Sequence, residues 1–485
     1  MHRSLQLVIL VAALAAVIVP RPASAQTAAS EYSARRDRLL TALGDGVVVL
    51  SGAEEPKEDY LSFWQSPDFD YLTGIHEPGA KLVLVKQGAA VTQFLFTEEK
   101  NPAREVWTGA RLGPTRAGLM TGMMGRSLAD FSRVLDSLLP TATRAFTTGD
   151  ESIKADMVKR NAGLTVASAE VALRQLRGTK SEAELACIRR AVEVTVEAQS
   201  LAMRAVRPDA HEFEIQGLVE YAFRRNGSDR PSFGTIIGSG PNSTTLHYNE
   251  NDRKMLAGEV VVMDIGASFK GYAADVTRTV PVSGTFSPAQ RDIYQIVRDA
   301  QAAAEKEAQP GADAKRMSAA ASRVLAEGLA RVGLITGADA TYDCGATGAK
   351  KCPQLGLYYM HGLGHGIGLE VHDPDQYYFT GKLEPGSAFT IEPGIYVREN
   401  LMEILPNTPG NAALLNGIRG AHAKYRNIGV RIEDDYLVTS KGVEWVSRAP
   451  REMAEIEALM KLGPATLSTA QPPTNPSCTP GQVQP

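Results

Sequence analysis

The chain lacks any excess of basic charge and any zinc-binding cysteine pattern. Its 485 residues carry 51 Lys and Arg against 55 Asp and Glu, with no basic stripe, which argues against a nucleic-acid partner. The four cysteines have no zinc-knuckle spacing. Gly238-Ser239-Gly240 lacks the third glycine of a dinucleotide fingerprint. With 44% apolar and 22% charged residues, the chain is typical of a globular protein with two or three domains.

Long apolar runs are also missing, except for one at the N-terminus. Leu5–Val19 is apolar at all but one position, follows Arg3 and precedes the small residues Ala23-Ser24-Ala25. It is too short for a hydrocarbon core of ~30 Å, which takes about 20 residues. We therefore expect a cleaved signal peptide at residues 1–25, rather than an uncleaved anchor helix. The mature protein is expected to be exported, periplasmic or secreted, and free of the membrane after cleavage.

Export draws attention to the cysteines, because disulfides form in oxidising compartments. Cys344 and Cys352 bracket the short sequence GATGAKK, where we expect either a disulfide or two free thiols. Cys187 falls within a helical pattern and is expected to be a small buried hydrophobic residue. Cys478 lies in a tail rich in proline, threonine and glutamine.

Two domains are expected from the order of the helix and strand patterns. Residues 31–176 predict an α/β unit, with a basic helix at 31–43, strands at 46–50, 81–85 and 91–96, and a helix near 125–139. Residues 177–462 predict an α+β domain, with helices near 181–196, 208–226, 287–300, 314–332 and 451–462 between strands. Ser181 with Glu184 forms a capping box, and Pro288 follows Ser287 as a first helical residue. Residues 463–485 are expected to be disordered.

Two aspartates share one face of a predicted hairpin. GEVVVMDIGAS and YAADVTRTVPV flank a turn near residues 269–271, which places Asp264 opposite Asp275 or, one register step on, Thr277. Both carboxylates face the same side in either register. Bare carboxylates about 5 Å apart repel each other, so an apolar strand pair keeps them only with a proton or metal ions between them. The alternative is a solvated pair beside a turn.

The stretch MHGLGHGIGLEVHD holds three histidines and alternates large residues with glycines. His361 and His365 are four residues apart, but the interleaved glycines argue against a helix. In an extended chain both imidazoles point the same way, and the glycine face allows close approach of another backbone. A lone histidine is more often a core residue, but His372 follows shortly after. We therefore interpret the stretch as part of a site.

Two glutamates complete the candidate set. Glu392 ends the apolar run SAFTI just before Pro393-Gly394, where a strand breaks. Glu433, in GVRIEDD, is expected to share a strand face with Arg431 and Asp435. Either glutamate alone could equally be an exposed residue at a strand end.

Four carboxylates and one imidazole together form an oxygen-rich set: Asp264, Asp275, His365, Glu392 and Glu433. Such a set suits two divalent ions that share bridging carboxylates and activate one water between them. The sequence therefore predicts a two-metal hydrolase.

The chain resembles the pita-bread metallopeptidases, the family of aminopeptidase P, prolidase, methionine aminopeptidase and creatinase. GSGPNSTTLHYNEN, MDIGASFKGYAADVTRT, MHGLGHGIGLEVHD, TIEPGIY and YRNIGVRIEDD occur in the family order. FWQSPDFDYLTGIHEPGAKLVLV and EVWTGARLG are similar to the front domain of aminopeptidase P, which methionine aminopeptidase lacks. The resemblance spans roughly residues 31–445. It implies a C-terminal pita-bread domain preceded by a smaller α/β domain.

The resemblance also implies a role for each site residue. The five acidic and imidazole residues would hold a dinuclear centre, typically of manganese, with cobalt or zinc as alternatives. Asp275 and Glu433 would bridge both ions, Asp264 would bind one, and His365 and Glu392 the other. The substrate site would be formed by three histidines and an arginine: His247, His361, His372 and, beside Glu433, Arg431.

The implied reaction releases the N-terminal residue from peptides with proline at the second position. A metal-activated hydroxide would attack the carbonyl before proline, and His372 would help to hold the oxyanion. Glu392 would take the water proton and return it to the leaving nitrogen, with His361 or His247 assisting. The nearest alternative is a prolidase-like dipeptidase, and a remote one is a non-catalytic binding module.

Three segments depart from the family pattern, and all are expected near the rim of the site. They are PDQYY after LEVHD, a longer segment at about 399–424, and the loop between Cys344 and Cys352. Trp107 in EVWTGARLG is expected either to approach a neighbouring subunit's site in a homo-oligomer or to pack between domains.

Overall fold

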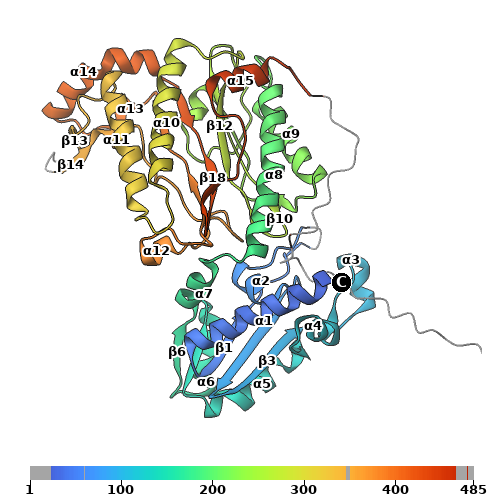
Figure 1. Ribbon diagram of the computed structural model, residues 1–485. Coiled ribbons are helices and arrows are strands. Elements are labelled where there is room, and N and C mark those ends of the chain that lie inside the picture. The colour runs from blue at the N-terminus through green and yellow to red at the C-terminus, as the bar shows by residue number, and fades with distance from the viewer. Residues whose placement is uncertain (1–22, 59–60, 346–349, 466–477, 479–485) are drawn as a thin grey trace, which may run out of the picture.

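The structure, a computed structural model, describes residues 23–58, 61–345, 350–465 and 478. The chain forms two domains, joined where α7 (Glu170–Arg177) passes into α8 (Glu182–Ala205) (Figure 1). Residues 1–22 of the predicted signal peptide lie outside the described part. None of the helices within the described ranges has both the length and the apolar character that crossing a membrane requires.

The N-terminal domain is built on one mixed sheet with the strand order β4-β3-β2-β1-β5-β6. Its strands are β1 (Gly46–Ser51), β2 (Lys81–Gln87), β3 (Ala90–Thr97), β4 (Met124–Ser127), β5 (Arg144–Thr147) and β6 (Thr165–Ser168). Side chains alternate across each strand, so Val48 and Leu84 enter one core while Val47 and Val83 enter the other. Because both faces are buried, the runs VVVL and LVLV are continuously apolar.

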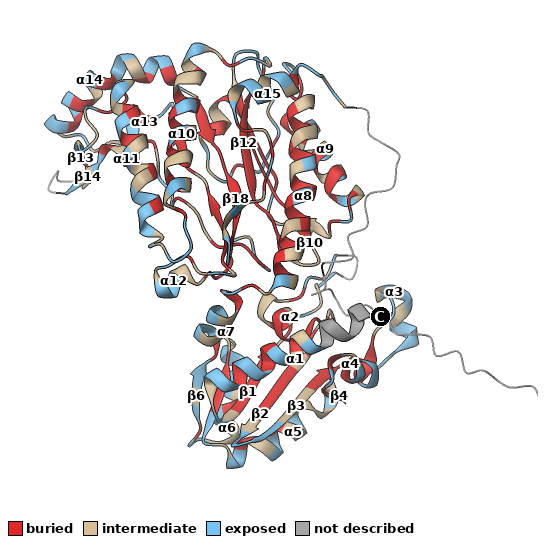
Figure 2. Ribbon diagram, in the orientation of Figure 1, coloured by how far each residue is buried: buried red, intermediate tan, exposed pale blue. Residues whose placement is uncertain are grey.

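Helices cover both faces of this sheet (Figures 1 and 2). One core is formed with α1 (Ala23–Leu43), α2 (Pro67–Thr73), α4 (Gly113–Thr121) and α7, the other with α5 (Phe131–Leu138) and α6 (Glu151–Arg160). The three predicted strands are confirmed, and the predicted helix at 31–43 lies within α1. The helix predicted near 125–139 is wrong in its first part, because Met124–Ser127 pairs with β3 as a parallel edge strand. Pairing with an existing strand outweighs weak local propensity there.

The C-terminal domain has two helix pairs around central strands. α8 and α9 (Glu212–Arg225) lie on one side of the strands, and α10 (Pro288–Glu307) and α11 (Lys315–Arg331) on the other (Figure 1). The predicted capping box at Ser181 is present, Pro288 is the first residue of α10, and α15 (Met453–Met460) is the predicted last helix. The α+β fold class is confirmed.

Short antiparallel sheets fill the space between the helix pairs. β8 (Ile236–Ser239), β9 (Val260–Ile265) and β12 (Val276–Pro281) form one, and β15 (Ala388–Ile391), β18 (Asp434–Thr439) and β19 (Gly442–Trp445) another. Smaller sheets pair β16 (Gly394–Tyr396) with β17 (Gly429–Arg431), and join β7 (Arg230–Pro231), β10 (Ala267–Phe269) and β11 (Tyr272–Ala273). Most of these strand residues are buried (Figure 2), so polar side chains among them need partners.

All four cysteines are disulfide-bonded. Cys344–Cys352 closes the hairpin of β13 (Thr341–Asp343) and β14 (Lys351–Pro353), which decides between the two predicted alternatives. Cys187 is buried as predicted, but it is bonded to Cys478, so its prediction as a plain hydrophobic residue is wrong. The helical pattern around Cys187 carried no information about a partner 291 residues away.

The predicted disordered tail is held at Cys478. That residue is buried, and its carbonyl oxygen accepts a hydrogen bond from Lys270 Nζ at 2.9 Å. Residues 466–477 and 479–485 lie outside the described part of the chain. Cys478 is therefore attached to the C-terminal domain.

The longer segment at 399–424 and the region around Trp107 both form helices. The segment at 399–424 contains α13 (Leu401–Ile404) and most of α14 (Pro409–Tyr425), which contacts β13 and α10. Trp107 lies on α3 (Pro102–Thr108) with 76% of its surface exposed, so it does not pack between the domains of this chain.

Candidate metal centre

The hairpin that carries the two aspartates has a two-residue turn. Lys270 and Gly271 both have positive φ, at 50° and 82°, which is the geometry of a tight hairpin turn that matches strand twist. The resulting register pairs Asp264 with Thr277, the second of the two predicted alternatives. Asp275 is two residues from Thr277, so both aspartates face the same side, and both are almost fully buried.

The histidine stretch is irregular rather than helical, as its glycines predicted. A Cβ atom on Gly364 would lie 2.0 Å from the carbonyl oxygen of Thr390, and one on Gly366 would lie 2.4 Å from that of Asp373. Only glycine allows such close backbone approach. The contact with Thr390 brings His365 against the end of β15, beside Glu392.

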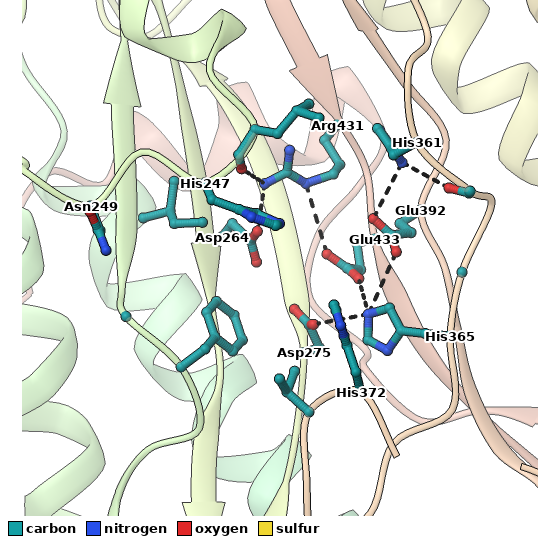
Figure 3. A pocket seen from close by; sticks show the side chains of 17 residues that line it. His247, Asn249, Asp264, Asp275, His361, His365, His372, Glu392, Arg431 and Glu433 are labelled. Carbon is teal, nitrogen blue, oxygen red and sulfur yellow. Dashed lines mark hydrogen bonds and ion pairs between the residues drawn. The ribbon is translucent and has the colours of Figure 1, made fainter. Parts of the chain in front are cut away.

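His365 faces three carboxylates. Its Nδ1 lies 3.1 Å from the carbonyl oxygen of Gly366, which can only accept, so Nδ1 carries the hydrogen and Nε2 is left as an acceptor. Nε2 lies 3.4 Å from Asp275 Oδ2, 3.5 Å from Glu392 Oε1 and 3.9 Å from Glu433 Oε1 (Figure 3). Asp275, His365 and Glu433 each offer a ligand atom within 4.8 Å of the others.

Asp264 stands at the far side of this group, beside Arg431. The Arg431 guanidinium donates to Asp264 Oδ2, to the Tyr396 hydroxyl at 2.9 Å and to Thr277 Oγ1 at 3.2 Å. Its Nε is 4.0 Å from Glu433 Oε2. Arg431 was predicted to lie beside Glu433, but it contacts Asp264 more closely. Thr277 in turn donates to Glu433 Oε2 at 2.7 Å.

The strand predicted through Glu433 is interrupted. β17 ends at Arg431 and β18 begins at Asp434, so Glu433 lies in the break and Asp435 does not continue its face. Asp435 Oδ2 instead accepts from the backbone N–H of Asp275 at 3.1 Å, behind the site. The expected shared strand face is therefore wrong, although Arg431 and Glu433 both reach the site.

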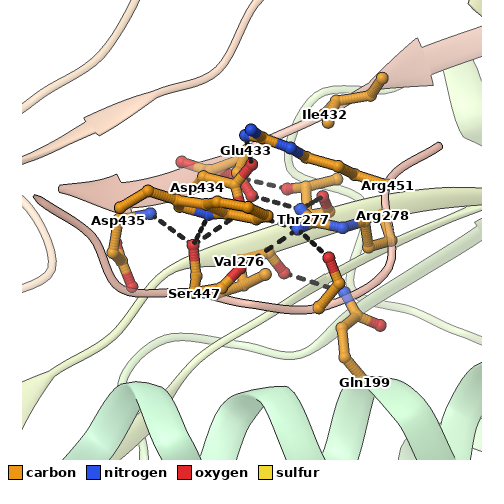
Figure 4. A network of polar contacts seen from close by, with 12 residues as sticks. Gln199, Val276, Thr277, Arg278, Ile432, Glu433, Asp434, Asp435, Ser447 and Arg451 are labelled. Atoms are coloured by element: carbon orange, nitrogen blue, oxygen red, sulfur yellow. Dashed lines mark hydrogen bonds and ion pairs between the residues drawn. The ribbon is translucent and has the colours of Figure 1, made fainter. Parts of the chain in front are cut away.

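A buried arginine holds this break in place (Figure 4). Arg278 is fully buried and donates to the carbonyl oxygens of Glu433 at 2.7 Å and Thr277 at 2.9 Å, and to Asp434 Oδ1 at 2.6 Å. Burial alone would raise the pKa of Asp434, but the positive charges of Arg278 and Arg451 hold it below its usual value. The network joins β12 to β18 and so fixes Asp275 and Glu433 relative to each other.

Without a cation, burial and mutual repulsion disfavour the charged form of the site carboxylates. Burial, then the charge of Glu433, raises the pKa of Asp275, and burial with the same neighbouring charge raises that of Glu392. Burial and the charge of Asp264 raise the pKa of Glu433 to about 8. One oxygen each of Asp264, Asp275 and Glu433 is buried without a hydrogen-bond donor. Divalent cations would satisfy these oxygens and compensate their charge, so the residues fit a metal centre.

Burial keeps His361 and His365 neutral by lowering their pKa values. It lowers the pKa of His365 to about 4, with His372 contributing, and that of His361 to about 4, with Arg431 contributing. A neutral imidazole is the form that binds metal. His361 has both nitrogens engaged: Nδ1 contacts the carbonyl oxygen of Gly362 and Nε2 the Tyr396 hydroxyl, each at 2.8 Å.

These side chains line one cavity of about 510 Å³. All nine predicted site residues contribute to it: His247, Asp264, Asp275, His361, His365, His372, Glu392, Arg431 and Glu433. The remaining wall is mostly apolar, formed by Phe233, Ile236, Leu246 and Val371, with Asn249 as a polar neighbour. Figure 3 shows residues from distant parts of the chain meeting around this space.

Comparison with known proteins identifies the family of this chain. Residues 186–440 match the model of metallopeptidase family M24, and residues 32–146 match that of the aminopeptidase P N-terminal domain. The chain belongs to metallopeptidase family M24. It is therefore a hydrolase, and the family implies divalent metal ions in the site. The predicted combination of an aminopeptidase P front domain and a pita-bread domain is confirmed.

Individual M24 relatives match over nearly their whole length. The Xaa-Pro aminopeptidase of Escherichia coli (strain K12) is 32% identical over 454 residues, covering 89% of this chain and 97% of that protein. The low-pH structure of aminopeptidase P from E. coli matches with a TM-score of 0.77 at 31% identity, covering 90% of this chain and 98% of that one. The aminopeptidase PepP structure from Pseudomonas aeruginosa, at 33% identity, has the same coverage and a TM-score of 0.77.

Sequence reasoning missed two residues of this M24 site. Tyr396 bridges Arg431 and His361 through its hydroxyl, and Thr277 bridges Arg431 and Glu433. Thr277 was predicted as a possible hairpin partner of Asp264, but not as a residue of the site. Tyr396 follows Glu392 in TIEPGIY, but nothing local indicates that its hydroxyl turns toward an arginine 35 residues away.

Proposed function

We propose that this protein is an Xaa-Pro aminopeptidase that releases the N-terminal residue from peptides with proline at the second position. The relatives named Xaa-Pro aminopeptidase match it over 89% of its length. The observation that carries the proposal is that Asp275 and Glu433, both buried with an unsatisfied oxygen, converge with Glu392 on His365 Nε2 inside a cavity. A non-catalytic binding module would have no reason to keep such a costly group of charges.

The proposed cofactor is a pair of divalent ions, with manganese as the native metal. Asp275 and Glu433 would be shared by both ions, Asp264 would bind one, and His365 and Glu392 the other. A donor set of oxygens with a single imidazole suits manganese better than a softer metal. When bound, the ions would act as Lewis acids on the scissile carbonyl and lower the pKa of a water molecule.

The protein's own residues would handle the proton and the substrate. Glu392, beside His365, is proposed to accept the water proton and return it to the proline nitrogen. His372, whose ring lies 4.1 Å from that of His365, would donate to the carbonyl oxygen as negative charge develops. His247 is better placed than His361 to contact the peptide, because both nitrogens of His361 are engaged within the protein.

Proline selectivity is attributed to the apolar wall of the cavity. A prolyl nitrogen in a peptide bond has no hydrogen, so a site cannot select proline through an N–H contact. A shaped surface for the ring is the alternative means. Phe233, Ile236, Leu246 and Val371, which line the same cavity as the metal ligands, would supply such a surface.

The test is a peptide panel with the purified protein and added manganese, cobalt or zinc. We expect cleavage of Xaa-Pro-Yaa peptides before proline, none of Xaa-Ala-Yaa peptides, and the highest rate with manganese. Asp275→Asn should abolish cleavage, whereas substitution of the exposed β19 residue Glu444, as Glu444→Gln, should not affect it. Cleavage of Xaa-Pro dipeptides alone would instead indicate a prolidase-like enzyme, and absence of cleavage and of bound metal would overturn the proposal.

We also propose that the protein is exported and forms a homo-oligomer. The charged, apolar and small-residue segments of residues 1–25 support export, and two disulfides suit an oxidising compartment. Val106 and Trp107, each more than three-quarters exposed on α3, support an oligomer contact. Cell fractionation with N-terminal sequencing tests the first proposal, and light scattering of wild type and Trp107→Ala tests the second.

A further inference from the structure

A loop beside the metal centre is held from outside the catalytic domain. We call residues 366–373 the histidine loop, because His365 precedes it and His372 stands near its end. Its base is closed by a bridge between Gly366 and Asp373, whose N–H donates to the Gly366 carbonyl oxygen at 2.8 Å. Contacts that hold this loop in place therefore also set the position of His372.

The centre of the histidine loop contacts the N-terminal domain. Leu369 packs against the core of that domain as well as against a core of the catalytic domain. The carboxylate of Asp373 lies inside the loop, where its Oδ1 accepts from the Glu370 N–H at 3.1 Å. A Cβ on Gly368 would lie 2.4 Å from Asp373 Oδ2, which shows how tightly the loop encloses this carboxylate.

One buried arginine links the N-terminal domain to this loop. Arg177, the last residue of α7, is 5% exposed and donates to Asp373 Oδ1 at 2.5 Å and to Glu370 Oε2 at 2.6 Å. Its other terminal nitrogen donates to Asp68 Oδ1 on α2 at 2.7 Å. Lys180 adds a second cation, with Nζ 3.2 Å from Asp373 Oδ2. Two cations thus neutralise much of the charge of three carboxylates at the domain boundary.

We propose that Arg177 is a positioning residue that couples the N-terminal domain to the substrate site through the histidine loop and His372. The proposal rests on the proposed function for the role of His372. Arg177 suits the task because its planar fork can hold three carboxylates in fixed directions, which a lysine ammonium cannot. The N-terminal domain would then act on catalysis without contributing a residue that contacts substrate.

A double-mutant cycle on an Xaa-Pro-Yaa peptide with manganese tests this coupling. Arg177→Gln should lower kcat/KM by about 10- to 100-fold, mainly in kcat, because a small displacement of a transition-state contact costs that much. Metal content should not change. In a His372→Ala background the same substitution should cost less than about threefold, because the group it positions is gone. Equal losses in the two backgrounds would overturn the proposal.

Arg35→Gln is the matched control. Arg35 is also a buried arginine at the domain boundary, 3.3 Å from Glu184, but it donates to Glu31, Tyr71 and Tyr272 rather than to the histidine loop. Its effect should be the same with and without His372. If Arg177→Gln does not fold, Asp68→Asn removes only the ion pair between Arg177 and the N-terminal domain. It should show the same coupling to His372, with a smaller loss of kcat/KM.

Hydrogen exchange separates failure of this inference from failure of the proposed function. Wild-type protein that cleaves no Xaa-Pro peptide would contradict the function but leave the loop testable. Arg177→Gln should then speed exchange of the Glu370 and Asp373 amides, whereas Arg35→Gln should not. Unchanged exchange at both amides in Arg177→Gln would overturn the positioning role.

Discussion

We expect the metal-free protein to become less stable as the pH rises. The raised pKa of Glu433 gives the size of this loss of unfolding free energy. Its side chain is buried, and its pKa in the folded protein is raised from 4.5 to about 8 by burial and by Asp264. Between these two pKa values, the Glu433 carboxyl is protonated in the folded state but ionised in the unfolded state. The contribution of Glu433 to the unfolding free energy is therefore fully present below its pKa in the unfolded chain. It is lost as the pH rises through its pKa in the folded protein.

The size of the effect follows from the shift. At about 1.4 kcal/mol per pKa unit, the shift of Glu433 corresponds to a loss of about 5 kcal/mol of unfolding free energy. Water entering the metal-free cavity relaxes part of this penalty, so the figure is an upper limit. It is nevertheless comparable to the whole stability of many domains, at roughly 5–15 kcal/mol.

Urea denaturation of chelator-treated protein between pH 5 and 8 measures this loss. We expect the unfolding free energy to fall with pH without metal, and the stabilisation by added manganese to grow over the same range. Glu433→Gln should flatten the slope and make the metal-free protein more stable than wild type at pH 8. Glu444→Gln on the surface should change neither. Metal-free stability that is constant or rises with pH, or equal slopes for wild type and Glu433→Gln, would refute the reasoning.

Three further predictions concern the site and the disulfides. Asp275→Asn should remove bound metal and activity together, which metal analysis and peptide assays would show. Tyr396→Phe should lower kcat by about 10-fold or more, because a hydrogen bond to a charged group such as Arg431 is worth about 1.5–3 kcal/mol; an unchanged kcat would contradict the bridging role. Cys187→Ser should destabilise the protein about twice as much as Cys344→Ser in urea, because the disulfides close loops of 291 and 8 residues.

The candidate site was predictable because its chemistry is local. Carboxylates in apolar strands, glycines between histidines and a glutamate at a strand break each mark a position whose side chain does not serve ordinary packing. All nine residues predicted from these patterns or from the family resemblance line the cavity, and His247 was implied by the resemblance alone. The helix starts at Ser181 and Ser287 were predictable for the same reason, because a cap depends on residues three positions apart.

Contacts between distant segments were not predictable in this way. The hairpin allowed two registers, and only packing chose Thr277 as the partner of Asp264. The break of the strand at Glu433 depends on Arg278, a residue 155 positions away whose guanidinium holds the Glu433 carbonyl. The Cys187–Cys478 disulfide, and the strand at Met124–Ser127, likewise depend on neighbours that no local pattern names.

By itself, then, the amino-acid order determined which side chains could bind metal, where the main helices begin and that two domains exist, because each depends on residue type and short spacing. The tertiary structure decided which oxygens face His365, which arginine neutralises Asp264 and how Arg177 links the domains. These depend on the approach of separate strands and loops, and the free energy of that approach is shared across the whole packed core rather than stored in any one stretch of sequence.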